Sequence, residues 1–552
     1  MLRQDNKRKT LHFYVSILEF GFRYLHLDAV WIPFGGMRAT RCKKVLGGVS
    51  ALNRLIVRQL TLDSPALEDG ILLPIGEDGS GVLVWLTHGR QVADLPAGAQ
   101  VWSARGSQAT FPCTICANVT ARGDRGLPAD AGDWLVDVSC SDPRQFQRKT
   151  SDEIFLQCDV LAELARRGHP PEVLNEQGQR FGLNYNPNGL LWDLQLRPFA
   201  GVTETWTYDG AHTLYGDGIL NTELSQTLEV INDDTRKTFT ELRALFEASW
   251  RTCSAFGPKK YSSALLGMIT EKREDYFREH GRIPLQMTEV ISLLPLVEFY
   301  TEHTDMERRR PLELARFCAG CRLSTQYWRC KRSSDIERDA NRFAELATDY
   351  TAKRHAAAGA DTTWQFKHHA THHLARQMVR DGGVLDCLAG ERAHLRARAV
   401  SSHVRNTSVF EHTMLARMLA SHLSRVKEEE SFEDRLLGKT HELNMPGLGR
   451  VSAAQACVLC GTHLAEFDVF FVATSRDPML IKACIEARGV GVALVVTRLL
   501  YGTDVNRVAT LNHESAHTDV LRSSDINGVT LCRAWSVEAD GSYVVVRAGS
   551  VY

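Results

Sequence analysis

Short apolar runs separated by glycine-containing turns characterise residues 11–105 of this chain. His12–Leu18 is rich in β-forming residues, and residues 70–75 and 81–86 flank a Gly-Glu-Asp-Gly-Ser-Gly turn. This pattern predicts an early strand followed by a β-hairpin. Between them, Ser50 precedes the apolar stretch 51–57, where we expect it to cap the start of a helix.

A helical pattern replaces the β pattern in the middle of the chain. Residues 152–170 predict a helix that ends near Gly168. Between residues 222 and 350, apolar side chains recur at helical spacing, as at Leu242 and Phe246, which predicts an all-α block. Residues 364–425 remain helical and become basic.

Alternating β runs and turns return in residues 466–552 and predict a small β-rich domain. We therefore expect an α/β protein in four parts. These are residues 1–221, a helical insertion over 222–360, a helical and basic part over 361–426, and a β-rich domain over 427–552.

Composition narrows the possible classes of protein. A chain of 552 residues can hold several domains, and its net charge of −1 gives no general attraction to nucleic acid, so such binding needs a local basic patch. No apolar run reaches 18 residues, and we expect no membrane span. The 14 cysteines, some in Cys-x-x-Cys pairs, favour a reducing compartment with thiols available for metal.

Two acidic motifs are the strongest candidates for chemistry. One is Asp209-Gly-Ala-His212 and the other is Glu391-Arg392, each with its acid beside apolar neighbours. A carboxylate is costly to hold there unless a cation needs it. Asp209 could instead cap a turn, and Glu391 with Arg392 could be an ordinary surface ion pair. Glu411 and Asp386 are alternative acids for the second motif.

Cysteine and histidine pairs offer metal ligands. Cys113 and Cys116 form a knuckle that could be half of a zinc site. The pairs Cys318/Cys321, with Cys330 nearby, and Cys457/Cys460 are equally compatible with buried thiols. On a helix, His368 with His372 and His369 with His373 lie four positions apart, which suits a divalent metal. The alternative is a polar helix face whose imidazoles meet solvent or phosphate.

The ordered set of motifs resembles cut-and-paste transposases of the CACTA and Kyakuja–Dileera–Zisupton type. Tyr-Asp-Gly-Ala-His followed by Gly-Ile-Leu-Asn is similar to the aspartate-x-x-histidine element of that family, the Cys113–Cys116 knuckle to its Cys-x-x-Cys insertion, and Glu391-Arg392 to its final glutamate region. The resemblance implies an RNase H-like core interrupted by a helical insertion. It also implies DNA as the partner, a nuclear location and a possible homo-oligomer.

Three acids holding two Mg²⁺ or Mn²⁺ ions are what the resemblance implies for the active site, because phosphodiester chemistry uses paired hard cations. Asp209 matches the second acid and Glu391 the third, and His212 is expected to join Cys113 and Cys116 at a zinc ion. Phosphate contacts are expected from basic residues and histidines of the closing helices, namely Lys367, His368, His372, Arg376, Arg380 and Arg392. Residues 7–9, Lys-Arg-Lys, are a second basic candidate.

The first acid is where the chain departs from the family. In the family, the first acid precedes a basic segment similar to Asp5-Asn6-Lys-Arg-Lys. In this sequence that segment stands almost at the start, and no acid precedes Asp5. We therefore expect the chain to be catalytically inactive as given. The alternative function is that of a non-catalytic remnant of a transposase that binds zinc and nucleic acid. A structural α/β protein with an accidental resemblance predicts instead that Asp209 and Glu391 lie far apart.

Overall fold

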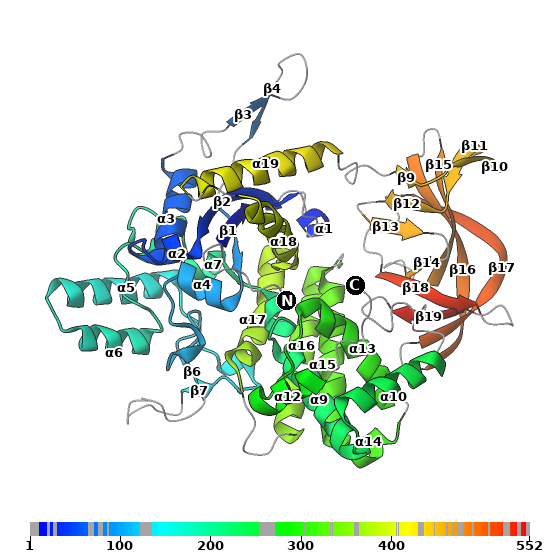
Figure 1. Ribbon diagram of the computed structural model, residues 1–552, viewed down its shortest axis with the longest axis horizontal. Helices are drawn as coiled ribbons and strands as arrows, with labels where there is room; N and C mark the ends of the chain where they lie inside the picture. The colour runs from blue at the N-terminus through cyan, green and yellow to red at the C-terminus, as the bar shows by residue number, and fades with distance from the viewer. Residues whose placement is uncertain are drawn as a thin grey trace.

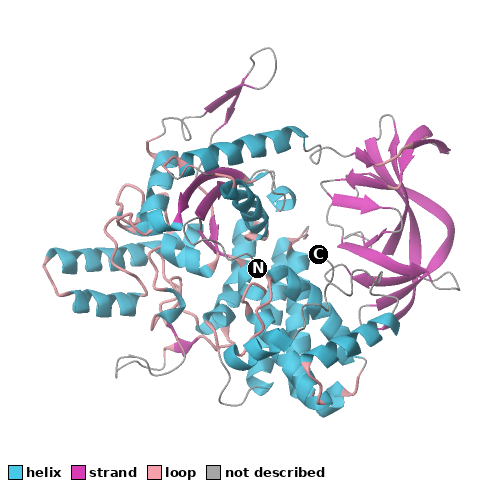
Figure 2. Cartoon of the chain, viewed as in Figure 1, coloured by secondary structure: helices cyan, strands magenta, loops and turns pink. Residues whose placement is uncertain are grey.

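The computed structural model describes most of the chain. The described residues are 10–18, 22–25, 30–63, 71–74, 81–84, 88–121, 134–252, 271–357, 364–428 and 435–547, except for short gaps at 303, 332, 334, 405, 407, 446–447, 460–461, 466–467, 472–477, 488–490, 506–507, 523–529 and 538–542. The protein is a mixed α/β structure in which helices predominate and the sheets are small (Figures 1 and 2).

The N-terminal region contains two antiparallel strand pairs. β1 (Thr10–Val15) is the predicted early strand and pairs with β2 (Ile32–Arg38), which the sequence analysis does not predict. β3 (Ile71–Pro74) pairs with β4 (Gly81–Val84), as the predicted hairpin requires. Helices α1 (Phe22–Leu25), α2 (Ala39–Cys42) and α3 (Gly48–Thr61) complete it. The prediction that Ser50 caps α3 was wrong. Gly47 holds that position, and the Ser50 hydroxyl accepts a hydrogen bond from the Leu190 amide instead.

A pair of parallel strands lies at the centre of this region. β5 (Gln91–Ala93) pairs with β8 (Trp206–Tyr208) in register, so that Ala93 lies opposite Tyr208. Each strand leads directly into a helix, β5 into α4 (Leu95–Val101) and β8 into α8 (Gly210–Leu214). The carboxyl ends of parallel strands meet at one edge of a sheet, and therefore both strand-to-helix turns lie there.

The segment between the two parallel strands carries the Cys-x-x-Cys knuckle and two longer helices. Its elements are β6 (Val119–Thr120), β7 (Val136–Asp137), α5 (Ser151–Arg166), α6 (Pro171–Phe181) and α7 (Val202–Thr205). In α5, Thr150 and Glu153 form a capping box at the start, and Gly168 takes a left-handed φ of 74° just after the end. Helices α5 and α6 project side by side from the rest of the molecule (Figure 1).

Helices alone fill the described part of residues 219–357, as the spacing of apolar residues predicts. They are α9 (Ile219–Thr235), α10 (Phe239–Thr252), α12 (Glu271–His280), α13 (Met287–Glu302), α14 (Met306–Arg309), α15 (Pro311–Cys330) and α16 (Ile336–Ala357). Their interior holds a charged group, because Glu223 of α9 is fully buried between Arg316 and Arg354. Helices α17 (Phe366–Asp381), α18 (Leu388–Ser402) and α19 (Phe410–Glu428) follow.

Strands make up the C-terminal part, as predicted. They are β9 (Arg435–Leu437), β10 (His441–Met445), β11 (Gly449–Ala454), β12 (Ala456–Leu459), β13 (Thr462–Ala465), β14 (Asp468–Phe471), β15 (Pro478–Ala487), β16 (Gly491–Val505), β17 (Val508–Arg522), β18 (Thr530–Val537) and β19 (Tyr543–Arg547). The antiparallel order β15-β14-β18-β19-β17-β16 closes on itself, because β16 also pairs with β15. This part has its own apolar clusters, around Cys457 and around Val451.

One continuous core joins the parallel strands to the helical block. It extends from Val57 to Met378 and includes the Cys-x-x-Cys knuckle, β8 and α17. Within it, Tyr327 of α15 packs against the turn that follows β8, and its hydroxyl donates a 2.8 Å hydrogen bond to Asp386, just before α18. A Cβ atom added to Gly210 would lie 2.6 Å from the Tyr327 ring. Glycine at this position therefore lets the turn approach α15 closely.

We predict that Gly210→Ala lowers the free energy of unfolding by about 1–3 kcal/mol, the usual range for overpacking a filled site. Tyr327 is completely buried, so its ring cannot move out into solvent to make room for the added methyl group. Gly390→Ala is the matched control, since Gly390 lies in α18 with no atom within 4 Å of an added Cβ. It should be neutral or raise stability by about 0.5–1 kcal/mol. Denaturant unfolding of both variants checks this, and equal stability of the two would contradict it.

Candidate metal centre and acid site

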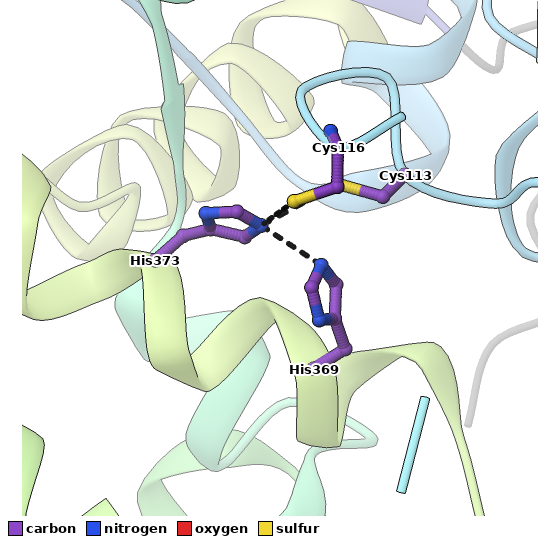
Figure 3. A group of neighbouring side chains, drawn as sticks. All are labelled: Cys113, Cys116, His369 and His373. Carbon is purple, nitrogen blue, oxygen red and sulfur yellow. Dashed lines mark hydrogen bonds between the residues drawn. The ribbon is translucent and has the colours of Figure 1, made fainter. Parts of the chain in front are cut away.

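Four buried side chains from two distant segments converge in the core. Cys113 and Cys116 lie on the loop after α4, and His369 and His373 lie one turn apart on α17. Figure 3 shows both imidazoles pointing from the helix toward the two sulfur atoms. Their ligand atoms all lie within 4.8 Å of one another.

The geometry of this cluster suits a zinc ion. His373 Nε2 lies 3.4 Å from Cys113 Sγ, 3.5 Å from Cys116 Sγ and 2.9 Å from His369 Nε2. Tetrahedral Zn²⁺ with ordinary bond lengths separates a sulfur from a nitrogen ligand by about 3.6 Å. Two thiolates and two imidazoles with no open position are a donor set typical of structural zinc.

Local electrostatics favour the metal-binding protonation states of Cys113 and His373, whereas the hydrogen bond with Cys113 and burial raise the pKa of the Cys116 thiol. Burial alone would raise the pKa of the Cys113 thiol, but a hydrogen bond from Cys116 and the nearby His373 hold that pKa well below its ordinary value. Burial lowers the pKa of His373, which keeps the ring neutral. Thiolate and neutral imidazole are the forms that ligate zinc.

The prediction of His212 as the third zinc ligand was wrong, because His369 and His373 complete the cluster. The four-residue spacing predicts that these two histidines can share a metal ion, but no sequence pattern connects them with a knuckle more than 250 residues earlier. His368 and His372 point elsewhere and are buried, 1% and 8% exposed. The predicted phosphate contacts of those two residues do not agree with their burial.

A second group of polar residues gathers at the carboxyl edge of β5 and β8. Asp209 follows β8, is 1% exposed and caps α8 by accepting a 3.0 Å hydrogen bond from the Ala211 amide. The same oxygen accepts a 3.2 Å hydrogen bond from the amide of Cys387 at the start of α18. Its other oxygen bonds to His212 Nδ1. Asp209 is therefore a capping residue, but it caps α8, whereas the alternative interpretation expected it to cap residues 216–224, where Gly218 begins α9.

His212 brings the two predicted acids together. Its Nδ1 contacts Asp209, and its Nε2 lies 3.5 Å from the half-exposed carboxylate of Glu391 in the first turn of α18. Asp209 and Glu391 thus lie on opposite sides of one imidazole ring. The hypothesis of a structural α/β protein with an accidental resemblance predicts that these two acids lie far apart. The observed arrangement differs from that prediction.

Asp94 is a third carboxylate at this edge, and sequence reasoning missed it. It follows β5 as Asp209 follows β8, and the last pair of the strand register, Ala93 with Tyr208, directly precedes the two aspartates. Asp94 caps α4 through the Ala97 amide, at 2.6 Å, and its charge reaches His212 and Cys387. Sequence reasoning sought a further acid only before Asp5, and residues 1–9 lie outside the described residues.

The contact between Asp209 and His212 favours the charged form of each group. Burial opposes the charge on each group, but their mutual hydrogen bond and attraction outweigh it, so the pKa of Asp209 is lowered and that of His212 is raised. The main-chain amide of Cys387 lowers the pKa of Asp209 further. The helix N-termini at Asp209 and Cys387 also favour a negative charge here.

The predicted basic contacts take different positions. The Lys367 amine is bonded to main-chain carbonyls, and burial lowers its pKa to about 8. The Arg380 guanidinium is bonded to Asp381 and to the Thr207 hydroxyl. Arg376 and Arg392 are exposed, so phosphate contact by these two stays a prediction. Residues 7–9 lie outside the described residues.

The alternative acids and thiols have structural partners. Glu411 forms ion pairs with Arg38 and Arg41, and Asp386 with Lys331. Among the described residues, the one group of ligand atoms close enough to share a metal ion is that of Cys113, Cys116, His369 and His373. It includes neither the thiols Cys318, Cys321, Cys330 and Cys457 nor the acids Asp94, Asp209 and Glu391, and Cys460 lies outside the described residues.

Comparison of the sequence with protein-family models and with curated proteins finds no match. In the part of the chain that the structure describes, every helix is too short or too polar to span a membrane.

We predict that His373→Ala abolishes stable zinc binding. Removing one of four ligands opens the coordination sphere, and the remaining three should lose zinc to a chelator that wild type resists. Elemental analysis after dialysis should find one zinc ion per chain in wild type and close to none in the variant. His403→Ala is the control, since His403 is an exposed histidine after α18. Equal zinc content in wild type and His373→Ala would contradict the assignment.

Proposed function

We propose that this protein is a transposase-like, DNA-binding enzyme of mobile-element origin, with an RNase H-like core that cleaves phosphodiester bonds with divalent metal ions. The observation that carries the proposal is that Asp209 and Glu391 contact the same imidazole at one edge of a parallel strand pair, where Asp94 follows the neighbouring strand and its charge acts on His212. Three acids from distant segments, beside an all-α insertion, are the arrangement that the resemblance implies.

Charge and position suggest different roles for the acids. Glu391 is half exposed and Asp94 partly exposed, so both can reach a hydrated cation. Asp209 already accepts two main-chain hydrogen bonds and keeps only its His212-facing oxygen for such a role. Oxygen-only donors suit Mg²⁺ or Mn²⁺, which would supply charge stabilisation at the attacking and leaving oxygens.

DNA would approach along α18, which begins at this edge. Arg392 follows Glu391 directly, and Arg398 lies further along the exposed side of the helix. Arginines beside an acidic site neutralise backbone phosphates and give binding a strong dependence on salt. Because the whole chain is nearly neutral, this local charge matters more than net charge.

A non-catalytic DNA-binding remnant with a zinc centre is the second candidate. The observation that favours it is His212, whose two nitrogens already contact Asp209 and Glu391. An imidazolium in this position satisfies the charge of both acids without a cation. The two functions share DNA binding and differ in catalysis.

We predict nicking of supercoiled DNA by the purified protein with Mn²⁺ or Mg²⁺. Asp94→Asn and Glu391→Gln should each lower the rate at least about 100-fold, because removing electrostatic stabilisation of a transition state has effects of this order. Glu411→Gln is the control, since its carboxylate pairs with Arg38 rather than facing the site. It should retain the wild-type rate if its melting temperature shows that it is folded.

Salt-dependent DNA binding without metal-dependent nicking would select the remnant. Nicking that survives Asp94→Asn and Glu391→Gln would place the activity elsewhere or in a contaminant. Absence of both binding and nicking would contradict the proposed function altogether.

A further inference from the structure

Lys367 lies where the metal centre meets the acid site. It is the second residue of α17, two positions before His369, so the two side chains leave the helix on nearly opposite sides. The His369 side faces the sulfur atoms of the knuckle (Figure 3). The Lys367 side faces α8, the short helix that carries His212.

All the donors of the Lys367 amine have acceptors. They bond to the main-chain carbonyls of His212 at 2.9 Å, Gly216 at 2.6 Å and Asp217 at 3.0 Å. An ammonium group has three N–H donors, and carbonyls at the end of a helix lack partners within it. Lys367 therefore closes the C-terminal end of α8 and has no donor left for a phosphate.

Tyr208 provides a second connection between the two sites. Its hydroxyl lies 3.6 Å from Cys113 Sγ, and its ring stacks on His373 with centroids 5.4 Å apart. The next residue is Asp209, and Gly210 to Leu214 form α8. The strand that contacts the metal ligands thus ends in the acid that His212 holds.

We propose that Lys367 is a positioning residue of the acid site and that the Cys₂His₂ centre holds it in place. A metal ion bound by Cys113, Cys116, His369 and His373 fixes α17 against the knuckle. Lys367 and Tyr208 then fix both ends of the Asp209–His212 segment. The catalytic consequence rests on the proposed function, whereas the mechanical connection does not.

Hydrogen–deuterium exchange of residues 209–218 tests the connection without DNA. Lys367→Met keeps the length of the side chain and removes its donors, so exchange in this segment should rise about tenfold, the order expected for losing charged hydrogen bonds. The variant should retain its zinc ion. Removing zinc from wild type should expose the same segment. Lys353→Met is the control, since Lys353 forms its ion pair with Asp349 within α16.

Two further comparisons separate positioning from a general loss of stability. Lys367→Arg keeps a charged donor and should restore part of the protection. If wild type nicks DNA, Lys367→Met should need about tenfold more Mn²⁺ for half-maximal rate, with the rate at saturating Mn²⁺ preserved. General unfolding would lower that saturated rate without changing the Mn²⁺ requirement.

Wild-type exchange in residues 209–218 of a zinc-loaded Lys367→Met protein would overturn the proposal. So would zinc removal that leaves this segment protected. Failure of the nicking assay alone would count against the proposed function and leave the exchange result as the test of Lys367.

Discussion

The buried carboxylate of Asp209 is the interaction on which the arrangement of the core depends. A charge that is 1% exposed must be compensated inside the protein. Two main-chain amides and an imidazole do this, and one of those amides belongs to Cys387, 178 residues further along the chain. The same carboxylate therefore caps α8 and holds the start of α18, which brings Glu391 to His212.

The Cys₂His₂ cluster is a second place where distant segments of the chain meet, and the sequence separation is larger than at Asp209. Cys113 and His373 are 260 residues apart in sequence, and the helical insertion lies between them. Loop-closure entropy grows slowly with length, so a large insertion is tolerated if its ends are held firmly. Here one contact joins Asp209, after β8, to the start of α18, and the other joins the Cys113 loop to α17; β8 and α17 both belong to the same apolar core. The insertion is held in addition by Tyr327 and Lys331 on Asp386.

Sequence reasoning predicted the local elements well and the long-range geometry only in part. The helical block and the β-rich end follow from apolar spacing, which is a local signal. The zinc cluster did not, because a four-residue histidine spacing is equally compatible with a polar surface, and nothing near Cys113 in sequence indicates its partners. Asp94 was missed for a similar reason. Only the parallel pairing of two three-residue strands brings it to the same edge of the sheet as Asp209.

Charged residues were assigned least accurately. Lys367 and Arg380 stand in a basic stretch that suggests phosphate binding, yet their donors serve carbonyls and a carboxylate within the fold. The sequence shows which side chains are charged, but it does not show which of them form hydrogen bonds or ion pairs within the fold. Exposed Arg376 and Arg392 keep the predicted role open, whereas burial removes it from His368 and His372.

The central claim is that Asp94, Asp209 and Glu391 form a site for divalent cations, separate from the zinc centre. Anomalous diffraction from crystals soaked in MnCl₂ tests it most directly. The account predicts a manganese peak in contact with the carboxylates of Asp94 and Glu391, and a zinc peak among Cys113, Cys116, His369 and His373. A zinc peak with no manganese at the three acids would contradict it.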